Sequence, residues 1–250
     1  MGNALNLVKK LNEEQKETRI TMTHLMTLAA GWGLYKMRRD VGRLPFGTFK
    51  ASKKMGVTVL VDVEGGKDLV AVTIWDCHKM TIHEVAKLIN DRVKKAKVGK
   101  DAQHNKATQF ANFIPSFLAQ PLLFFGTYIA TVCGVTNEAL SLKPDSFGHV
   151  VVTNVGSLGY TSAIAPLCPI VHQMCLLCTG AIQKRVVVGE NDEIKIAQMM
   201  TCTVTGDHRY GDAAIFIPFF SAFKGYITDP ANFDHTKFKD VPHYTELKNN

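Results

Sequence analysis

The sequence predicts a domain that mixes helices and β-strands in one layered fold. Two runs of β-favouring residues, 55–63 and 69–75, flank the glycine-containing turn 64–68 and predict a pair of adjacent strands. Between Thr23 and Met37, apolar residues recur at intervals of three and four, which predicts a helix packed on one side. With 250 residues and 46% hydrophobic content, the chain can bury the core of a single α/β domain.

The two ends of the chain differ in composition from the part between them. Residues 1–19 are polar and carry charges of both signs, which predicts a solvated helix or arm. We therefore expect an N-terminal arm at 1–19, a main domain at 20–230 and a C-terminal tail at 231–250.

A second helix is predicted after Met80. Thr81 followed by Glu84 has the spacing of a capping box, in which each side chain accepts a hydrogen bond from the other residue's backbone N–H. The apolar residues that follow at helical spacing predict its buried face: Val85, Leu88, Ile89 and Val93.

The stretch Phe110 to Val135 is nearly uncharged and rich in aromatic and aliphatic residues. It has the length of a membrane-spanning helix, but polar residues and the prolines Pro115 and Pro121 interrupt it. We favour a packing surface or an interface here over a membrane span.

The balance of charge and the cysteines limit the partners and the compartment. A net charge of +7 suits an anionic partner such as the phosphates of coenzyme A, a nucleic acid or an acidic membrane surface. Basic residues occur along much of the chain, so we expect no nucleic acid. The six cysteines lie mostly in apolar runs and no signal peptide is evident, which predicts reduced thiols in an intracellular compartment, cytoplasmic or mitochondrial. Cys175 and Cys178 have the spacing of a redox or metal motif but lie in a run typical of a buried strand, so we predict no metal site.

The stretch from Thr201 to Ala214 holds the strongest chemical pattern. Threonines alternate with apolar residues up to Gly206, which predicts a strand that ends there and leaves His208 at the mouth of a sheet. An apolar helix interrupted near Pro218 is expected next. Imidazole suits proton transfer at neutral pH, and Asp212 follows four residues later. A histidine and an aspartate at this spacing are also compatible with a surface or structural pair.

Several segments together resemble one known family. Asp207, His208, Arg209 and Asp212 match the Asp-His-Arg-x-x-Asp-Gly signature of the dihydrolipoyl acyltransferase catalytic domain of 2-oxoacid dehydrogenase complexes, a relative of chloramphenicol acetyltransferase. The segments 153–159 and 181–187 resemble further family segments in the same order. Ala213 stands where the signature has its final glycine.

The resemblance implies an architecture. We expect an α/β two-layer sandwich of the chloramphenicol acetyltransferase type, with a mixed sheet and helices on one face, assembled as a homotrimer with active sites between subunits. Relative to the acyltransferase components, the chain has a helical insert at about 101–146, as in small free-standing members of the family. No segment resembles a lipoyl domain, so no lipoyl group is expected on this chain, and a higher-order assembly of trimers is compatible with the family.

The implied function is acyl transfer from a coenzyme A thioester to a thiol, hydroxyl or amine, with coenzyme A or acyl-CoA as substrate. His208 is then the general base and Asp212, also counted as catalytic, holds the local structure together with Arg209. Asp207, Arg209 and Thr205 are expected to support the site. The family stabilises the oxyanion with a hydroxyl in the 153–159 segment.

The hydroxyl is displaced in this sequence. Gly156 stands at the expected position and Ser157 comes one residue later. Ser157 fills the role, or Thr205 or a backbone amide substitutes, or the oxyanion site is absent and Ser157 is a turn residue. The alternative is a non-catalytic trimer that serves as a structural subunit of a larger assembly, which Ala213, Gly156 and the apolar insert favour.

Overall fold

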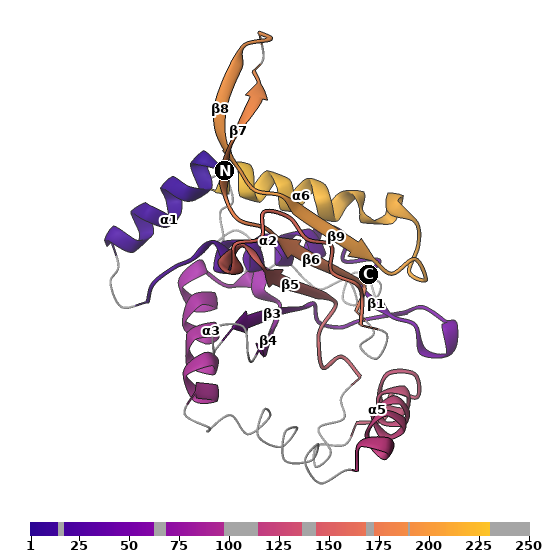
Figure 1. Ribbon diagram of the computed structural model, residues 1–250. Helices are drawn as coiled ribbons and strands as arrows, with labels where there is room; N and C mark the ends of the chain where they lie inside the picture. Colours follow the sequence, from indigo (N-terminus) through magenta and orange to yellow (C-terminus); the bar gives the residue numbers. More distant parts are fainter. Residues whose placement is uncertain are drawn as a thin grey trace.

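A five-stranded mixed sheet forms the centre of the fold, in the order β4-β3-β5-β6-β9 (Figure 1). The computed structural model describes residues 1–14, 18–62, 69–97, 115–136, 144–168, 173–189 and 191–230. The five strands are β3 (Gly56–Asp62), β4 (Leu69–Trp75), β5 (Val150–Asn154), β6 (Cys175–Thr179) and β9 (Cys202–Gly206).

The pairing of the strands makes this sheet mixed, as predicted. β3 and β4 pair antiparallel in a register that joins Gly56 to Trp75 and Asp62 to Leu69, which confirms the predicted strand pair. β3, β5 and β6 run parallel, and β9 returns antiparallel beside β6. The predicted glycine turn at 64–68 lies outside the described residues.

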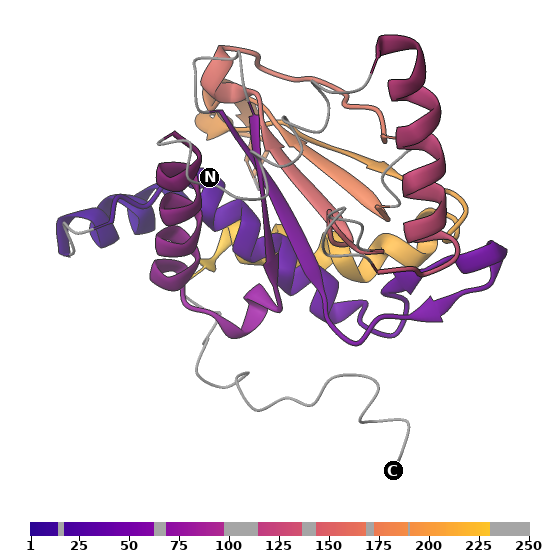
Figure 2. The ribbon, with the colours of Figure 1, turned by 90° about the horizontal axis from the view of Figure 1, so that it is seen from below.

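Helices cover one face of the sheet (Figure 2). They are α2 (Met22–Lys36), α3 (Ile82–Lys97) and α6 (Ile217–Thr228), while α1 (Gly2–Glu14) packs on α6 and α2. A further helix, α5 (Ser116–Thr131), lies apart from this layer. Pro218 lies in the first turn of α6, where its missing N–H costs nothing, so the proline starts this helix and does not break it.

Helix α2 is the element on which the main core is built. Its residues from His24 to Tyr35 are all buried, because α6, α3 and the sheet enclose it. The helix was predicted at the right place, but the prediction that it packs on one side only was wrong. The spacing of the large apolar side chains marks only one face of the helix. The other faces are covered as well, because residues such as Ala29, Ala30 and Gly31 are small enough to pack closely against neighbouring elements.

The capping box at the start of α3 is present as predicted. The Thr81 backbone N–H donates to Glu84 Oε2 at 2.7 Å, and the Glu84 N–H donates to Thr81 Oγ1 at 3.3 Å. Val85 and Ile89 are buried, while Leu88 and Val93 are partly buried against the same core.

The second face of the sheet has a smaller core. Val151, Leu176 and Cys178 lie on it, whereas their strand neighbours face the helices. The segment 160–168 covers this face, and the hydroxyls of Thr203 and Thr205 donate to its backbone carbonyls. This extended segment takes the place of a second helical layer.

Two shorter antiparallel ribbons extend from the body. The first pairs β1 (Gly42–Arg43) with β2 (Lys50–Ala51), joined through the 3-10 turn η1 (Pro45–Gly47). The second pairs β7 (Gln183–Val188) with β8 (Ile194–Met199) and projects away from the sheet in Figure 1. On one face of this second ribbon lie four aliphatic side chains that are 68–78% exposed: Val186, Val188, Ile194 and Ile196.

The N-terminal residues and the insert both form helices. α1 lies against α6 and α2, with Ala4 fully buried and Leu11 partly buried. In the insert, the described part of the apolar stretch forms α5. None of the helices in the described ranges is long and apolar enough to cross a bilayer. Residues 98–114 and 137–143 of the insert, and the tail 231–250, lie outside the described residues.

Candidate active site

His208 lies in a tight turn directly after β9. Asp207 continues the strand, because its N–H donates to the Met174 carbonyl at 2.8 Å beside the start of β6. The turn then closes through the Tyr210 N–H, which donates to the Asp207 carbonyl at 3.0 Å. The strand therefore ends where the sequence predicts, and it places His208 at one end of the sheet.

The Asp207–Arg209 pair fixes the backbone on both sides of His208. Arg209 Nε donates to both Asp207 carboxylate oxygens, at 3.0 and 2.9 Å, and its Nη2 donates to Oδ2 at 2.6 Å. The Arg209 backbone N–H also donates to Asp207 Oδ1 at 3.0 Å. Hydrogen bonding to the carboxylate raises the pKa of Arg209, so the pair stays ionised. Since Asp207 is buried, this is a local clamp rather than a solvated surface pair.

Asp212 caps the short 3-10 turn that leads into α6. Its Oδ1 accepts a hydrogen bond from the Ala214 N–H at 3.0 Å, at the start of η4 (Ala213–Phe216). Ala213 has an ordinary negative φ, and the extreme backbone angle in this turn belongs to Gly211, with φ 151°. The alanine in place of the family glycine therefore fits without strain.

The His208 imidazole points into solvent. The side chain is exposed, and within the described part of the chain no hydrogen bond or ion pair holds it. Asp212 uses its carboxylate for the cap and does not contact the imidazole. Both ring nitrogens are thus available to a molecule that binds from outside.

Ser157 lies in a second turn, directly after β5. Its hydroxyl donates to the Asn154 carbonyl at 3.0 Å within the 3-10 turn η3 (Gly156–Leu158), and the side chain is exposed. Asn154 organises this turn: its Oδ1 accepts from the Gly156 N–H at 2.9 Å, and its Nδ2 donates to Thr23 Oγ1 at 3.0 Å. Sequence reasoning missed Asn154, although an asparagine two residues before a glycine is the pattern of an Asx turn.

The backbone around Gly156 explains why the hydroxyl cannot stand there. A Cβ atom on Gly156 would lie 2.6 Å from the Ala181 nitrogen and from the carbonyl group of Gly180. Both contacts are with backbone that cannot rotate away. Only glycine fits at position 156 because the Gly180–Ala181 backbone passes so close. The nearest hydroxyl therefore stands at position 157.

Thr205 uses its hydroxyl for structure. Its Oγ1 donates to the Ala165 carbonyl at 2.8 Å, which ties β9 to the segment that covers the second face of the sheet. The predicted supporting role is consistent with this contact. Thr205 is only half-buried, but it is less accessible to an oxyanion than the exposed Ser157, whose hydroxyl also donates to a backbone carbonyl.

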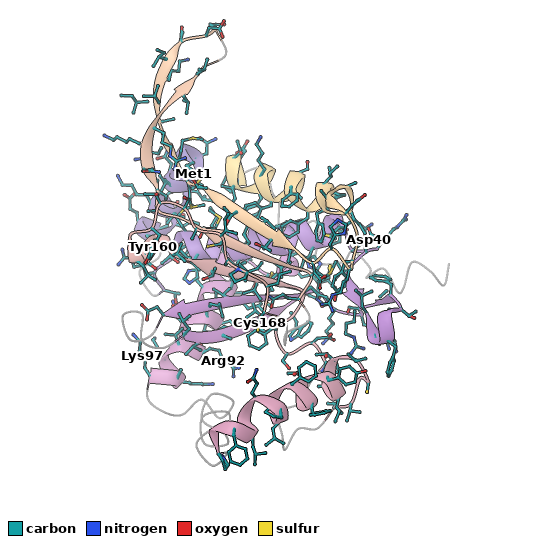
Figure 3. The ribbon with its side chains drawn as sticks, turned by 45° about the vertical axis from the view of Figure 1, so that its right-hand side comes forward. Met1, Asp40, Arg92, Lys97, Tyr160 and Cys168 are labelled. Carbon is teal, nitrogen blue, oxygen red and sulfur yellow. The ribbon has the colours of Figure 1, made fainter. Side chains whose placement is uncertain are left out.

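Ser157 and His208 lie at opposite ends of the sheet within one chain. Asn154 at the end of β5 is level with Cys202 at the start of β9, because both pair with Thr179 of β6. The other end of β9, Gly206, is four residues further, or roughly 13 Å along the strand, and His208 comes just after it. The arrowheads of β5 and β9 point in opposite directions in Figure 1, and Tyr160, which is hydrogen bonded to Val155, marks the Ser157 end in Figure 3. The two groups therefore cannot act together in a single chain.

The cysteines offer no second site. Cys175 and Cys178 lie on opposite faces of β6, one in the main core and one in the smaller core, so they cannot bind one ion or form a disulfide. Burial raises the pKa of Cys175 to about 12. Within the described ranges, no group of three or more acidic, histidine or cysteine side chains gathers to hold a metal.

Comparison with known proteins relates the chain to one family. Residues 133–233 match the model of the 2-oxoacid dehydrogenases acyltransferase (catalytic domain). The dihydrolipoyllysine-residue acetyltransferase component of the pyruvate dehydrogenase complex of Rickettsia felis is 25% identical over 90% of this chain and 44% of that protein. Component 3 of the mitochondrial complex of Arabidopsis thaliana is 39% identical over 36% of this chain and 17% of that protein. The chain thus spans less than half the length of these curated relatives.

Solved structures show the same fold at low sequence identity. A probable dihydrolipoamide acetyltransferase from Listeria monocytogenes superposes with a TM-score of 0.64 at 15% identity, over 90% of this chain and 79% of that one. The cubic core of a pyruvate dehydrogenase multienzyme complex gives 0.65 at 12% identity, over 92% and 77% of the two chains. The dihydrolipoamide acetyltransferase of Azotobacter vinelandii gives 0.64 at 13% identity, also over 92% and 77%. In that enzyme, a serine, a histidine and an asparagine four positions after the histidine have been investigated for their role in catalysis. These structures confirm the predicted α/β fold class.

Proposed function

We propose that the chain is a coenzyme A-dependent acyltransferase of the family whose 2-oxoacid dehydrogenases acyltransferase (catalytic domain) model matches residues 133–233. The observation that carries the proposal is the clamp between Asp207 and Arg209, which holds an unpartnered His208 at the end of β9. A structural histidine would be held by its neighbours. This one is presented to solvent on a fixed turn, as a base for an incoming substrate must be.

The proposed reaction moves one acyl group and returns the histidine to its starting state. His208 takes the proton from the thiol, hydroxyl or amine of the acceptor, whose lone pair attacks the thioester carbonyl carbon. The exposed Ser157 hydroxyl rotates away from the Asn154 carbonyl and donates its hydrogen bond to the tetrahedral oxyanion instead. Collapse then breaks the carbon–sulfur bond, and the coenzyme A thiolate takes the proton from the imidazolium.

The two halves of this site come from two copies of the chain. Because His208 and Ser157 lie at opposite ends of one sheet, the proposal requires that His208 of one copy faces Ser157 of the next. The exposed aliphatic face of the β7–β8 ribbon supports such an assembly, since an isolated two-stranded ribbon of this kind is marginal in water. We take the assembly to be a homotrimer, in keeping with the family, and trimers associated further are compatible with it.

The acceptor and the compartment follow from the relatives as proposals. Several relatives are named dihydrolipoyllysine-residue acetyltransferases, so dihydrolipoamide is the first acceptor to test, with acetyl-CoA as donor. The free cysteines in the core support a reducing compartment, cytoplasmic or mitochondrial.

The first prediction concerns His208. His208→Ala should lower the rate of acetyl transfer from acetyl-CoA to dihydrolipoamide by about a hundredfold or more, because general-base catalysis is lost. Thiol release from acetyl-CoA measures the rate, and calorimetry measures the binding of coenzyme A. The melting temperature should not change, since the side chain is exposed and no hydrogen bond or ion pair holds it within the described part of the chain.

The controls separate the site from the fold. Lys224→Ala, an exposed residue on α6, should leave both rate and stability unchanged. Full activity in His208→Ala would overturn the mechanism. A stable wild-type assembly that neither binds coenzyme A nor turns over would favour the non-catalytic structural subunit.

A further inference from the structure

Helix α5 has its apolar face turned outward. Phe117, Phe124 and Phe125 are 77%, 60% and 62% exposed. With four more exposed apolar side chains they form one face that spans roughly 160° of the helix surface: Leu118, Leu122, Tyr128 and Ile129. Among the described side chains of the helix, only the small Ala130 and Thr131 at its C-terminal end are buried. This is the reverse of a soluble surface helix, which buries its large apolar side chains.

A basic hairpin lies close to the helix α5. We use the name for residues 39–54, which contain β1, η1 and β2. Figures 1 and 2 both show it next to α5 at the same side of the molecule. This hairpin and the residues 36–38 that precede it hold seven of the chain's 29 basic residues and one acidic residue. The local net charge of this stretch is therefore strongly positive, although basic residues also occur elsewhere in the chain.

Most of this charge is free to meet a partner. Arg43 pairs with Asp145 at 3.3 Å, and Arg38 lies over the Tyr35 ring. The other five basic side chains are exposed: Lys36, Arg39, Lys50, Lys53 and Lys54. The antiparallel register sets Arg43 directly opposite Lys50, a like-charge pair that weakens the hairpin in isolation.

The tip of the basic hairpin is aromatic. Phe46 is 72% exposed and has a left-handed backbone with φ 51°, which is strained for a bulky residue. Phe49 is also exposed. The strain is not offset by burial within the described chain, which suggests that these rings contact something outside it.

We propose that the apolar face of α5 and the basic hairpin together form a docking surface for an anionic lipid bilayer. Large apolar and aromatic side chains enter the interfacial region, while neighbouring lysines and arginines are attracted to acidic headgroups. The helix, at about 24 Å, is shorter than the roughly 30 Å of a hydrocarbon core, so it lies along the membrane.

Other occupants fit these features less well. A second copy that met this surface with the same surface would bring two strongly positive hairpins together. A nucleic acid would satisfy the lysines but would leave α5 uncovered, because Ser116–Thr131 contains no charged residue. A bilayer with acidic headgroups satisfies both parts at once.

Flotation of the full chain with vesicles tests the proposal. The protein should bind vesicles of phosphatidylcholine mixed with phosphatidylserine. Its affinity for vesicles of phosphatidylcholine alone should be lower by about tenfold or more. The double variant Phe124→Asp with Phe125→Asp should lose about tenfold or more in affinity for the mixed vesicles, as should Lys50→Glu with Lys53→Glu. Phe46→Asp provides an independent variant on a separate element.

Matched controls make the same chemical changes elsewhere. Leu69→Asp replaces an exposed leucine at the edge of β4, and Lys87→Glu reverses an exposed charge on α3; neither should weaken binding. Wild-type protein that does not float, or controls as damaging as the test variants, would overturn the proposal. Binding to soluble polyphosphate that depends only on the lysines would also overturn it. An assembly that forms without vesicles and dissociates in the phenylalanine variant would overturn it too, and would assign the surface to a second copy.

Discussion

At the scale of single residues, the site is shaped by backbone contacts that leave little choice of side chain. Asp207 and Arg209 hold the turn around His208, whose side chain makes no hydrogen bond within the described residues. Asn154 holds the turn that presents Ser157. The move of the hydroxyl from position 156 to position 157 follows from the close approach of the Gly180–Ala181 backbone. The departure from the family pattern thus has a steric cause.

Position 156 provides a direct test of this steric argument. Gly156→Ala should lower the free energy of unfolding by about 1–3 kcal/mol, because the new Cβ meets rigid backbone at 2.6 Å. Ser157→Ala, one residue later and exposed, should change it by less than about 0.5 kcal/mol. Urea denaturation measures both. Equal stability of Gly156→Ala and wild type would show that the turn can move.

At the scale of elements, α2 depends on a histidine at its start. His24 is buried, and its Nδ1 accepts a hydrogen bond from the Thr21 N–H at 3.2 Å. Burial lowers the pKa of His24 from 6.5 to about 4. Since α2 is the centre of the main core, protonation of this one side chain affects the whole helical layer.

The sign of the resulting pH dependence is fixed by the direction of the shift. Between pH 6.5 and about 4 the unfolded chain binds a proton that the folded chain does not, so stability is full above pH 6.5 and falls as the pH drops through this window. The loss attributable to His24 should be on the order of 2 to 3 kcal/mol. His24→Gln keeps an acceptor without titrating, so its unfolding free energy should fall less steeply over the same range. Parallel curves for the two proteins would contradict the assignment.

At the scale of the whole molecule, the sequence predicted much of the fold and only half of the site. Periodicity located α2, the β3–β4 pair and the end of β9, because each depends on local patterns of apolar residues. It could not show that α2 is enclosed on all sides, since that depends on what packs around Ala29 and Gly31. The motif identified His208, but the opposite placement of Ser157 follows from strand register, which is a property of the folded sheet.

Assembly is the whole-molecule property on which activity should depend. His208→Ala and Ser157→Ala proteins, each impaired alone, should regain part of the wild-type activity when dissociated and reassembled together, because mixed assemblies contain interfaces with both groups intact. Sedimentation should show a trimer, and the rate after mixing should rise only when subunits exchange. A monomer that turns over acetyl-CoA would contradict a site shared between copies.

The parallel pairing of β3 with β5 bears on how the chain can fold. The Gly56 N–H donates to His149, 93 positions later, so the central sheet closes only after a long segment, insert included, has been brought into a loop. The entropy of closing such a loop grows only with the logarithm of its length, at about 0.6 kcal/mol per doubling. Removing the insert would shorten the loop by about half and would change stability by little more than that. Evolution could therefore lengthen or replace this crossover at small thermodynamic cost, while the late, long-range pairing makes the β3 edge the part of a nascent chain most exposed to aggregation.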